Sequence, residues 1–106
     1  MITDQLQNPT VKAAIRALQE GDKVSWMALF APNADLLDDG NPRSLSAFTD
    51  EAIGNERFVT IDAVTNGGLN LEGTFHTKSW GDFRTYFRFH LNAEGKITRL
   101  EIGQAD

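Results

Sequence analysis

The chain of 106 residues contains no cysteine. Disulfide bonds, thiolate metal sites and cysteine nucleophiles are therefore excluded. A chain without disulfides is compatible with the reducing cytoplasm. The sequence also lacks any apolar run long enough for a signal peptide or a membrane span. We therefore expect a soluble, cytoplasmic protein with no membrane partner.

Positive charge is also scarce, because ten Lys and Arg residues stand against fifteen Asp and Glu residues. The formal net charge at pH 7 is -5, and the basic residues are scattered along the sequence. A protein with this charge repels a phosphate backbone, so we predict no nucleic-acid partner.

Motifs for metals and cofactors are missing too. The two histidines, His76 and His90, have no third ligand at a fixed spacing, so we predict no metal site. Gly67 and Gly68 lie between two strand-like segments, without the lysine and the helix that follow a phosphate loop. We predict no cofactor.

No linker-like tract and no internal repeat interrupts the sequence. A chain of this length with 41% hydrophobic residues can build one core and no second domain. We therefore predict a single domain over residues 1–106.

The first half of the sequence carries three helix signals. Asn8 and Pro9 are typical of a helix start, and Gly21 is typical of its end. The apolar residues between them are spaced for one buried stripe. This pattern predicts the first helix.

Two further helices are predicted before the strands begin. Asp22 opens a short helix that Pro32 cannot continue, and its many apolar residues predict that most of it is buried. After an extended piece over residues 34–37 and a turn that begins at Asp38, a third helix ends at Gly54.

The second half predicts four antiparallel strands joined by short turns, with Trp80 as an apolar plug at the end of one hairpin. In the third of these strands the two faces differ sharply in polarity. The odd positions are Phe83, Thr85, Phe87, Phe89 and Leu91, and the even positions are Asp82, Arg84, Tyr86, Arg88 and His90.

Helices followed by an antiparallel sheet indicate the α+β class, with three N-terminal helices packed on one face of the sheet. These helices must cover the row of Phe side chains, and any remaining space is an apolar pocket unless the Phe rings themselves fill it. We predict ligand contacts from Trp26, Phe75, Phe87, Phe89 and Leu100.

The polar face of the sheet is either open to solvent or the interface of a homodimer. Tyr and Arg are enriched at such interfaces, which favours the dimer. The predicted interface residues are His76, Arg84, Tyr86, Arg88 and His90.

Several strings, in their order and spacing, resemble those of the nuclear transport factor 2-like superfamily, which includes ketosteroid isomerase and the SnoaL-like polyketide cyclases. The strings are Glu20-Gly21-Asp22, then Leu29-Phe30-Ala31-Pro32-Asn33-Ala34, then Asp38 before a glycine turn, and finally Gly95-Lys96-Ile97. The resemblance spans nearly the whole chain. It implies a single SnoaL-like domain with a cystatin-like cone, in which a curved sheet wraps around helices and encloses a deep pocket.

The resemblance also implies roles for individual residues. Asp38 aligns with the aspartate that moves a proton in ketosteroid isomerase, so it is the candidate general base. Gln104 faces the pocket and can donate a hydrogen bond to a ligand carbonyl. The two oxyanion donors of that enzyme align with Ala14 and Phe87, which carry no donor.

Two hypotheses therefore remain open. In the first, the protein is a binding or interaction module whose pocket holds a small hydrophobic ligand or merely closes as core, and whose acidic residue is structural. In the second, it is a cofactor-independent isomerase, cyclase or dehydratase that uses Asp38 as general acid or base on a small carbonyl compound. The turn string at Asp38 and Asp39 also suits a purely structural role, in which an aspartate bonds its own backbone.

Overall fold

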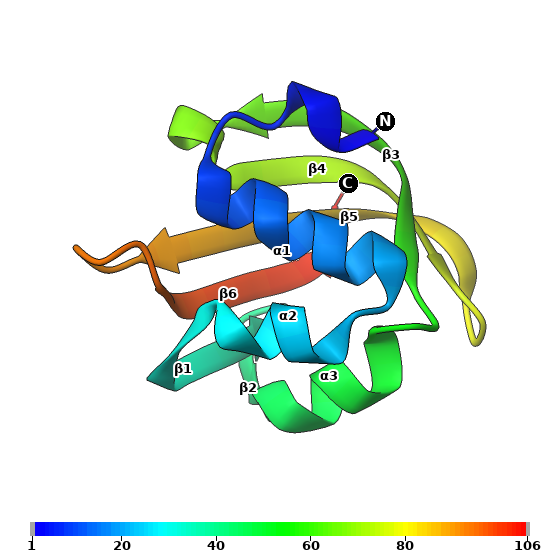
Figure 1. The fold of residues 1–106 in the computed structure, drawn as a ribbon. Coiled ribbons are helices and arrows are strands. Elements are labelled where there is room, and N and C mark those ends of the chain that lie inside the picture. The colour runs from blue at the N-terminus through cyan, green and yellow to red at the C-terminus, as the bar shows by residue number, and fades with distance from the viewer. Residues whose placement is uncertain (1, 106) are drawn as a thin grey trace.

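The computed structural model describes residues 2–105 and confirms the α+β class. The helices are α1 (Pro9–Glu20), α2 (Lys23–Ala28) and α3 (Leu45–Ala52), with short 3-10 helices at Ile2–Gln5 and Asn66–Gly68. The strands are β1 (Phe30–Asp38), β2 (Asn41–Arg43), β3 (Arg57–Thr65), β4 (Asn70–Thr77), β5 (Gly81–Leu91) and β6 (Ile97–Gln104). The helices lie against one face of the sheet (Figure 1).

The ends of α1 follow the predicted signals. The Asn8 side chain accepts hydrogen bonds from the backbone N–H groups of Thr10 and Val11, at 3.0 and 3.1 Å. These bonds satisfy two of the donors that a helix start leaves free. Gly21 closes the helix with a φ of 72°, a left-handed conformation that a residue without Cβ adopts at low cost.

The prediction that α2 is mostly buried is wrong. Trp26 is fully buried, and its Nε1 donates to Thr49 Oγ1 on α3 at 3.1 Å. Val24 and Met27, by contrast, have exposed fractions of 82% and 38%. The apolar residues were too close in sequence to share one face of a helix of six residues, so those opposite Trp26 point to solvent.

The first strand is longer than the extended piece predicted over residues 34–37. It begins at Phe30, so Pro32 lies inside β1 and does not mark the end of a helix. The register between β1 and β6 shifts between Phe30 and Asp35. A proline is tolerated at such an irregularity because no ladder hydrogen bond is required from it.

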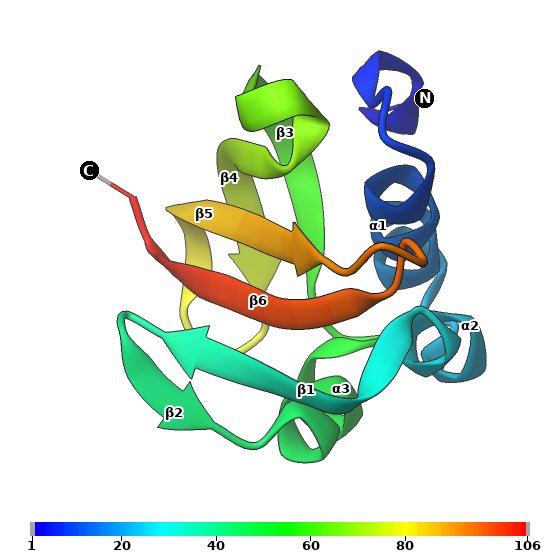
Figure 2. The same ribbon diagram turned by 90° about the vertical axis from the view of Figure 1, so that its left-hand side faces the viewer.

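The six strands form one sheet in the order β2-β1-β6-β5-β4-β3. All neighbours are antiparallel except β1 and β6, which are parallel. Figure 2 shows the sheet curling from β3 at one edge to β2 at the other, with the helices on its inner side. The first strand of the chain, β1, is therefore paired with the last strand, β6.

The predicted two-sided character of β5 is confirmed. Thr85, Phe87 and Phe89 are buried, whereas Arg88 and His90 are exposed. The Phe rings join the apolar stripe of α1 in one core. Burial of apolar side chains in this core stabilises the fold by about 25 cal/mol per Å² removed from water.

Candidate functional site

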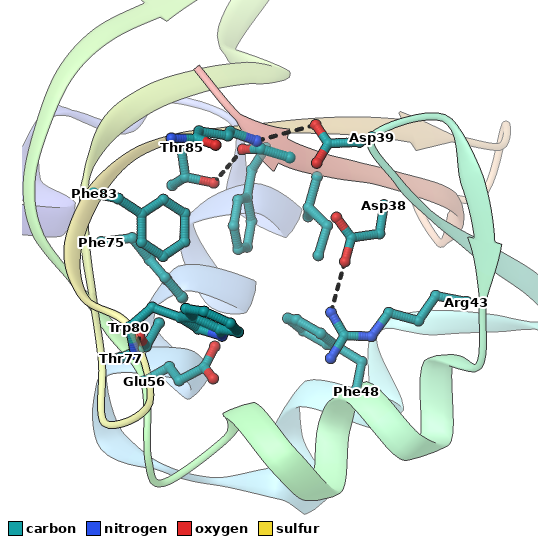
Figure 3. Close-up of a pocket in the computed structure, with 14 residues that line it drawn as sticks. Asp38, Asp39, Arg43, Phe48, Glu56, Phe75, Thr77, Trp80, Phe83 and Thr85 are labelled. Atoms are coloured by element: carbon teal, nitrogen blue, oxygen red, sulfur yellow. Dashed lines mark hydrogen bonds and ion pairs between the residues drawn. The ribbon is translucent and has the colours of Figure 1, made fainter. Parts of the chain in front are cut away.

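The inner side of the curled sheet retains a cavity of about 490 Å³ (Figure 3). It lies at the end of the sheet where β5 begins and where β1 and β6 end. Its lining comprises Asp38, Asp39, Arg43, Phe48, Glu56, Phe75, Thr77, Trp80, Phe83, Thr85, Phe87, Ile102, Gly103 and Gln104. The Phe rings therefore leave room for a small molecule.

Aromatic rings supply most of the apolar lining. Phe75 lies between Phe83 and Phe87, with ring centroids 6.3 and 5.6 Å away, and these three rings come from the inner faces of β4 and β5. Phe48 joins them from α3. Trp80, interpreted from the sequence as an apolar plug, is 83% exposed and stands at the mouth of the cavity.

The β1–β2 hairpin positions an ion pair on the lining. Asp39 and Gly40 have φ of 51° and 83°, so the chain turns back within two residues. Arg43 Nη1 then donates to Asp38 Oδ2 at 2.8 Å, diagonally across the hairpin. The second guanidinium nitrogen, Nη2, donates to Glu51 on α3 at 2.8 Å. The guanidinium carbon also lies 5.1 Å from the centroid of the Phe48 ring.

Glu56 enters the cavity from the loop between α3 and β3. Gly54 has a φ of 97°, and the N–H groups of Asn55 and Glu56 both donate to Ala52 O, at 2.9 and 2.8 Å. This tight turn directs the Glu56 side chain toward the cavity (Figure 3). Burial raises the pKa of the Glu56 carboxyl, an effect that the charge of Arg43 opposes and the charge of Glu51 reinforces.

The far edge of the cavity is closed by β6. The Thr85 hydroxyl donates to Gly103 O at 2.6 Å, and the Gln104 N–H donates to Asp39 Oδ1 at 3.2 Å. A Cβ on Gly103 would collide with Asp39 Oδ1 and lie 2.6 Å from the Tyr86 hydroxyl. Burial, followed by the nearby Asp39 carboxylate, raises the pKa of Tyr86.

Comparisons with solved structures identify this architecture. An NTF2-like protein of unknown function from Cytophaga hutchinsonii superimposes with a TM-score of 0.75 at 15% identity, covering 95% of this chain and 92% of that one. The chain has the nuclear transport factor 2-like fold. This result agrees with the resemblance seen in the sequence.

Two other matching structures have names that mention a reaction or a ligand. A candidate polyketide cyclase from Sinorhizobium meliloti matches with a TM-score of 0.74 at 18% identity, covering 96% of this chain and 99% of that one. The orange carotenoid protein of Anabaena (Nostoc) sp., in a structure that binds canthaxanthin, matches with a TM-score of 0.73 at 21% identity. That match covers 92% of this chain but 35% of the carotenoid protein. No protein-family model and no curated protein matches the sequence.

The NTF2-like cavity brings together some of the residues predicted from the sequence. Asp38, Gln104, Phe75 and Phe87 line it. The other predicted ligand contacts lie in the core outside the cavity lining, where they are buried to 1% exposure or less: Trp26, Phe89 and Leu100. Two of them contact rings of the lining, since Trp26 packs against Phe48 and Phe89 against Phe87, with centroids 6.3 and 6.2 Å apart.

Sequence reasoning missed Arg43 and Glu56. The string Asp39-Gly40 is typical of a two-residue hairpin turn, and that turn predicts the approach of Arg43 to Asp38. Glu56 had no comparable signal, because its loop follows no periodic pattern. Its position depends on how α3 packs against the sheet.

The predicted dimer residues all lie on the outer face of the NTF2-like sheet, where partners within the chain already engage them. His76 Nδ1 contacts Asp82 Oδ1 at 2.6 Å, His90 Nε2 contacts Glu101 Oε2 at 2.5 Å, Arg84 pairs with Asp62, and Arg88 lies over the ring of Tyr86. The homodimer stays a prediction, which sedimentation velocity tests directly. A monomer at micromolar concentration would contradict it.

Among residues 2–105, no group of three or more His, Cys, Asp or Glu side chains is arranged to hold a metal ion. None of the described helices has the length and apolar content required to cross a membrane.

Proposed function

We propose that the protein binds a small, largely apolar molecule in the cavity between the helices and the curled sheet. The observation that carries this proposal is the volume of about 490 Å³ that remains in front of Phe75, Phe83 and Phe87. Ligand pockets commonly have volumes of roughly 300–1,000 Å³ and combine apolar walls with a few polar groups that orient the ligand. Thr85, Gln104 and the Asp38–Arg43 pair supply such groups.

The relatives give this proposal its context. The Anabaena protein carries canthaxanthin, which is an apolar ligand, and the Sinorhizobium protein is described as a candidate polyketide cyclase. Both share the fold with this chain at low sequence identity, and one fold can host many activities. The main argument for the proposal is therefore the lining of this cavity, and the similar structures are supporting evidence.

Binding can be tested by amide NMR titration with neutral aromatic compounds such as phenethyl alcohol and indole. We expect saturable shifts at the amides of Thr85, Phe87 and Gly103. The Phe83→Trp variant adds volume inside the cavity and should abolish these shifts. Leu91→Phe enlarges a side chain of the same strand outside the cavity and should leave them intact. If the wild-type protein shows no saturable shift with any such compound, the proposal fails.

A second candidate function is a cofactor-independent isomerase, cyclase or dehydratase with Asp38 as general base. The observation that favours it is the pair of polar groups opposite one another in the cavity, the Asp38–Arg43 ion pair and Glu56 (Figure 3). An acid–base reaction needs a base together with a group that stabilises the developing charge. Glu56 in its protonated form provides a hydrogen-bond donor, which Ala14 and Phe87 lack.

Proton transfer can be tested without knowledge of the substrate. A cyclic ketone incubated with the protein in deuterated water exchanges its α-protons, and NMR follows the rate. We expect Asp38→Asn to remove any acceleration, whereas Glu94→Gln, on the distant β5–β6 turn, should keep it. Equal exchange rates with the wild type and with Asp38→Asn would exclude Asp38 as the base for that ketone class.

A further inference from the structure

The charges on the cavity lining are unbalanced. Three carboxyl groups, those of Asp38, Asp39 and Glu56, line it together with one cationic side chain, Arg43. Arg43 is already engaged, because its two terminal nitrogens donate to Asp38 and Glu51 at 2.8 Å each. The lining therefore offers no free cation to an anionic ligand.

Glu56 is the carboxyl group with the least compensation. Among residues 2–105, none donates a hydrogen bond to its carboxyl oxygens, and the charges that act on it are those of Arg43 and Glu51, which oppose each other. A partly buried carboxylate without a hydrogen-bonded partner gains more from a nearby cation than a solvated one does. Figure 3 shows this carboxyl beside Trp80, facing the space that Phe48 borders from the other side.

The aromatic lining favours positive charge as well. An aromatic ring attracts a cation to its face, and several rings around one space form a cage for ammonium groups. Five rings line this cavity, those of Phe48, Phe75, Trp80, Phe83 and Phe87. One of them already holds a cation of the protein itself, since the Arg43 guanidinium lies 5.1 Å from the Phe48 centroid.

We propose that the cavity selects organic cations, with the apolar body of the ligand against Phe75, Phe83 and Phe87 and its ammonium group beside Glu56 and Trp80. This inference rests on the proposed function and narrows its ligand class. The net charge of -5 on the chain would also speed the approach of a cation.

Three matched probes test the inference at neutral pH: phenethylamine, which is a cation, phenethyl alcohol, which is neutral, and hydrocinnamate, which is an anion. Amide NMR titration measures each dissociation constant. We expect phenethylamine to bind at least about tenfold more tightly than the alcohol, and hydrocinnamate to bind most weakly. Added salt should reduce the preference for the amine and leave the affinity for the alcohol unchanged.

Two variants locate the effect. Glu56→Gln keeps the shape of the side chain and should remove most of the preference for phenethylamine while retaining binding of the alcohol. Glu94→Gln makes the same change of charge on the exposed β5–β6 turn and should keep the preference. If Glu56→Gln fails to fold, the ranking of the three probes on the wild-type protein still decides the question.

The outcomes separate the two proposals. If phenethyl alcohol or hydrocinnamate binds as tightly as phenethylamine, the cation inference is overturned and the binding function stands. If the neutral compounds bind and the amine does not, the inference is overturned in the same way. If no probe binds to the wild-type protein, both the binding function and its cation class fail.

Discussion

Replacing Arg43 with methionine should destabilise the protein by about 1.5 kcal/mol. The change removes two ion pairs, to Asp38 and to Glu51, and the contact with the ring of Phe48. The side chains of Arg43 and Asp38 are 34% and 37% exposed, and that of Glu51 is 62% exposed, so each pair contributes roughly 0.2–1 kcal/mol. The cation on the ring adds about 0.5–1 kcal/mol. Methionine preserves the apolar packing of the stem.

Urea denaturation at low and high salt measures this loss. We expect most of the effect of Arg43→Met to disappear in high salt, since solvent-exposed pairs are screened. A double-mutant cycle with Asp38→Asn should give a coupling energy of about 0.5 kcal/mol. A loss above about 3 kcal/mol, or one that salt leaves unchanged, would refute this reasoning, because it would place the pair in a dry interior.

Arg43→Met should lower the stability of the protein but increase its affinity for a cation. Arg43 opposes the rise in the pKa of Glu56, so its removal should raise that pKa further, as an NMR titration of the carboxyl would detect. The cavity also becomes more negative, so Arg43→Met should bind phenethylamine more tightly than the wild type does. A variant that is less stable and yet binds the cation better would separate the two roles of Arg43. Weaker binding would contradict the charge argument.

Three further changes have outcomes that can be measured by urea denaturation. Glu56→Gln should be more stable than the wild type at neutral pH. Burial raises the pKa of Glu56, so folding favours the protonated carboxyl. The wild type therefore loses stability as the pH rises from the ordinary pKa of about 4.3 through the raised pKa. The difference should vanish below about pH 4, and an unchanged difference there would contradict this assignment. Gly73→Ala should lower the free energy of unfolding by about 2–4 kcal/mol, because a Cβ would lie 2.9 Å from Ile61 Cα and closer still to Thr60 O, which forces β3 and β4 apart. The control Thr74→Ala, on the same strand, should lower it by under about 1 kcal/mol. Asn8→Ala should cost about 1 kcal/mol through loss of the α1 cap, and a change below about 0.3 kcal/mol would show that water replaces the cap.

The features of the fold that the sequence predicted correctly depend on residues close together in the chain. The limits of α1 follow from Asn8 and Gly21, which act on the backbone within a few residues. The alternation in β5 predicts which face is buried, because neighbouring side chains on a strand point to opposite sides. These features need no knowledge of distant parts of the chain.

Features that depend on distant contacts were missed. Nothing local in β1 indicates that it pairs in parallel with β6, because its partners at Arg99 and Leu100 lie more than half the chain away. Glu56 reached the cavity through a loop, and the position of a loop side chain is set by the elements on either side.

The candidate site contains residues that were predicted from the sequence and residues whose positions depend on distant contacts. Asp38 and Gln104, which were predicted from the resemblance to known proteins, lie at the ends of β1 and β6 and line the cavity. The opposite wall of the cavity comes from the α3–β3 loop and from β4, which are separated from Asp38 by long stretches of sequence. Only the folded arrangement brings the charges of Arg43 and Glu56 into one space.

The parallel pairing of β1 with β6 also bears on how the protein is made. On the ribosome, the β1–β2 hairpin with Asp38 and Arg43 emerges early, but the strand that joins it to the rest of the sheet is completed only with Gln104. Contacts of such long sequence separation form slowly. The helices and strands β3 to β5 can pack together first, before the β1–β2 hairpin is paired with the rest of the sheet. The cavity would then be the last part of the molecule to assemble, and a nascent chain that stops before β6 would have a partial core and no closed cavity.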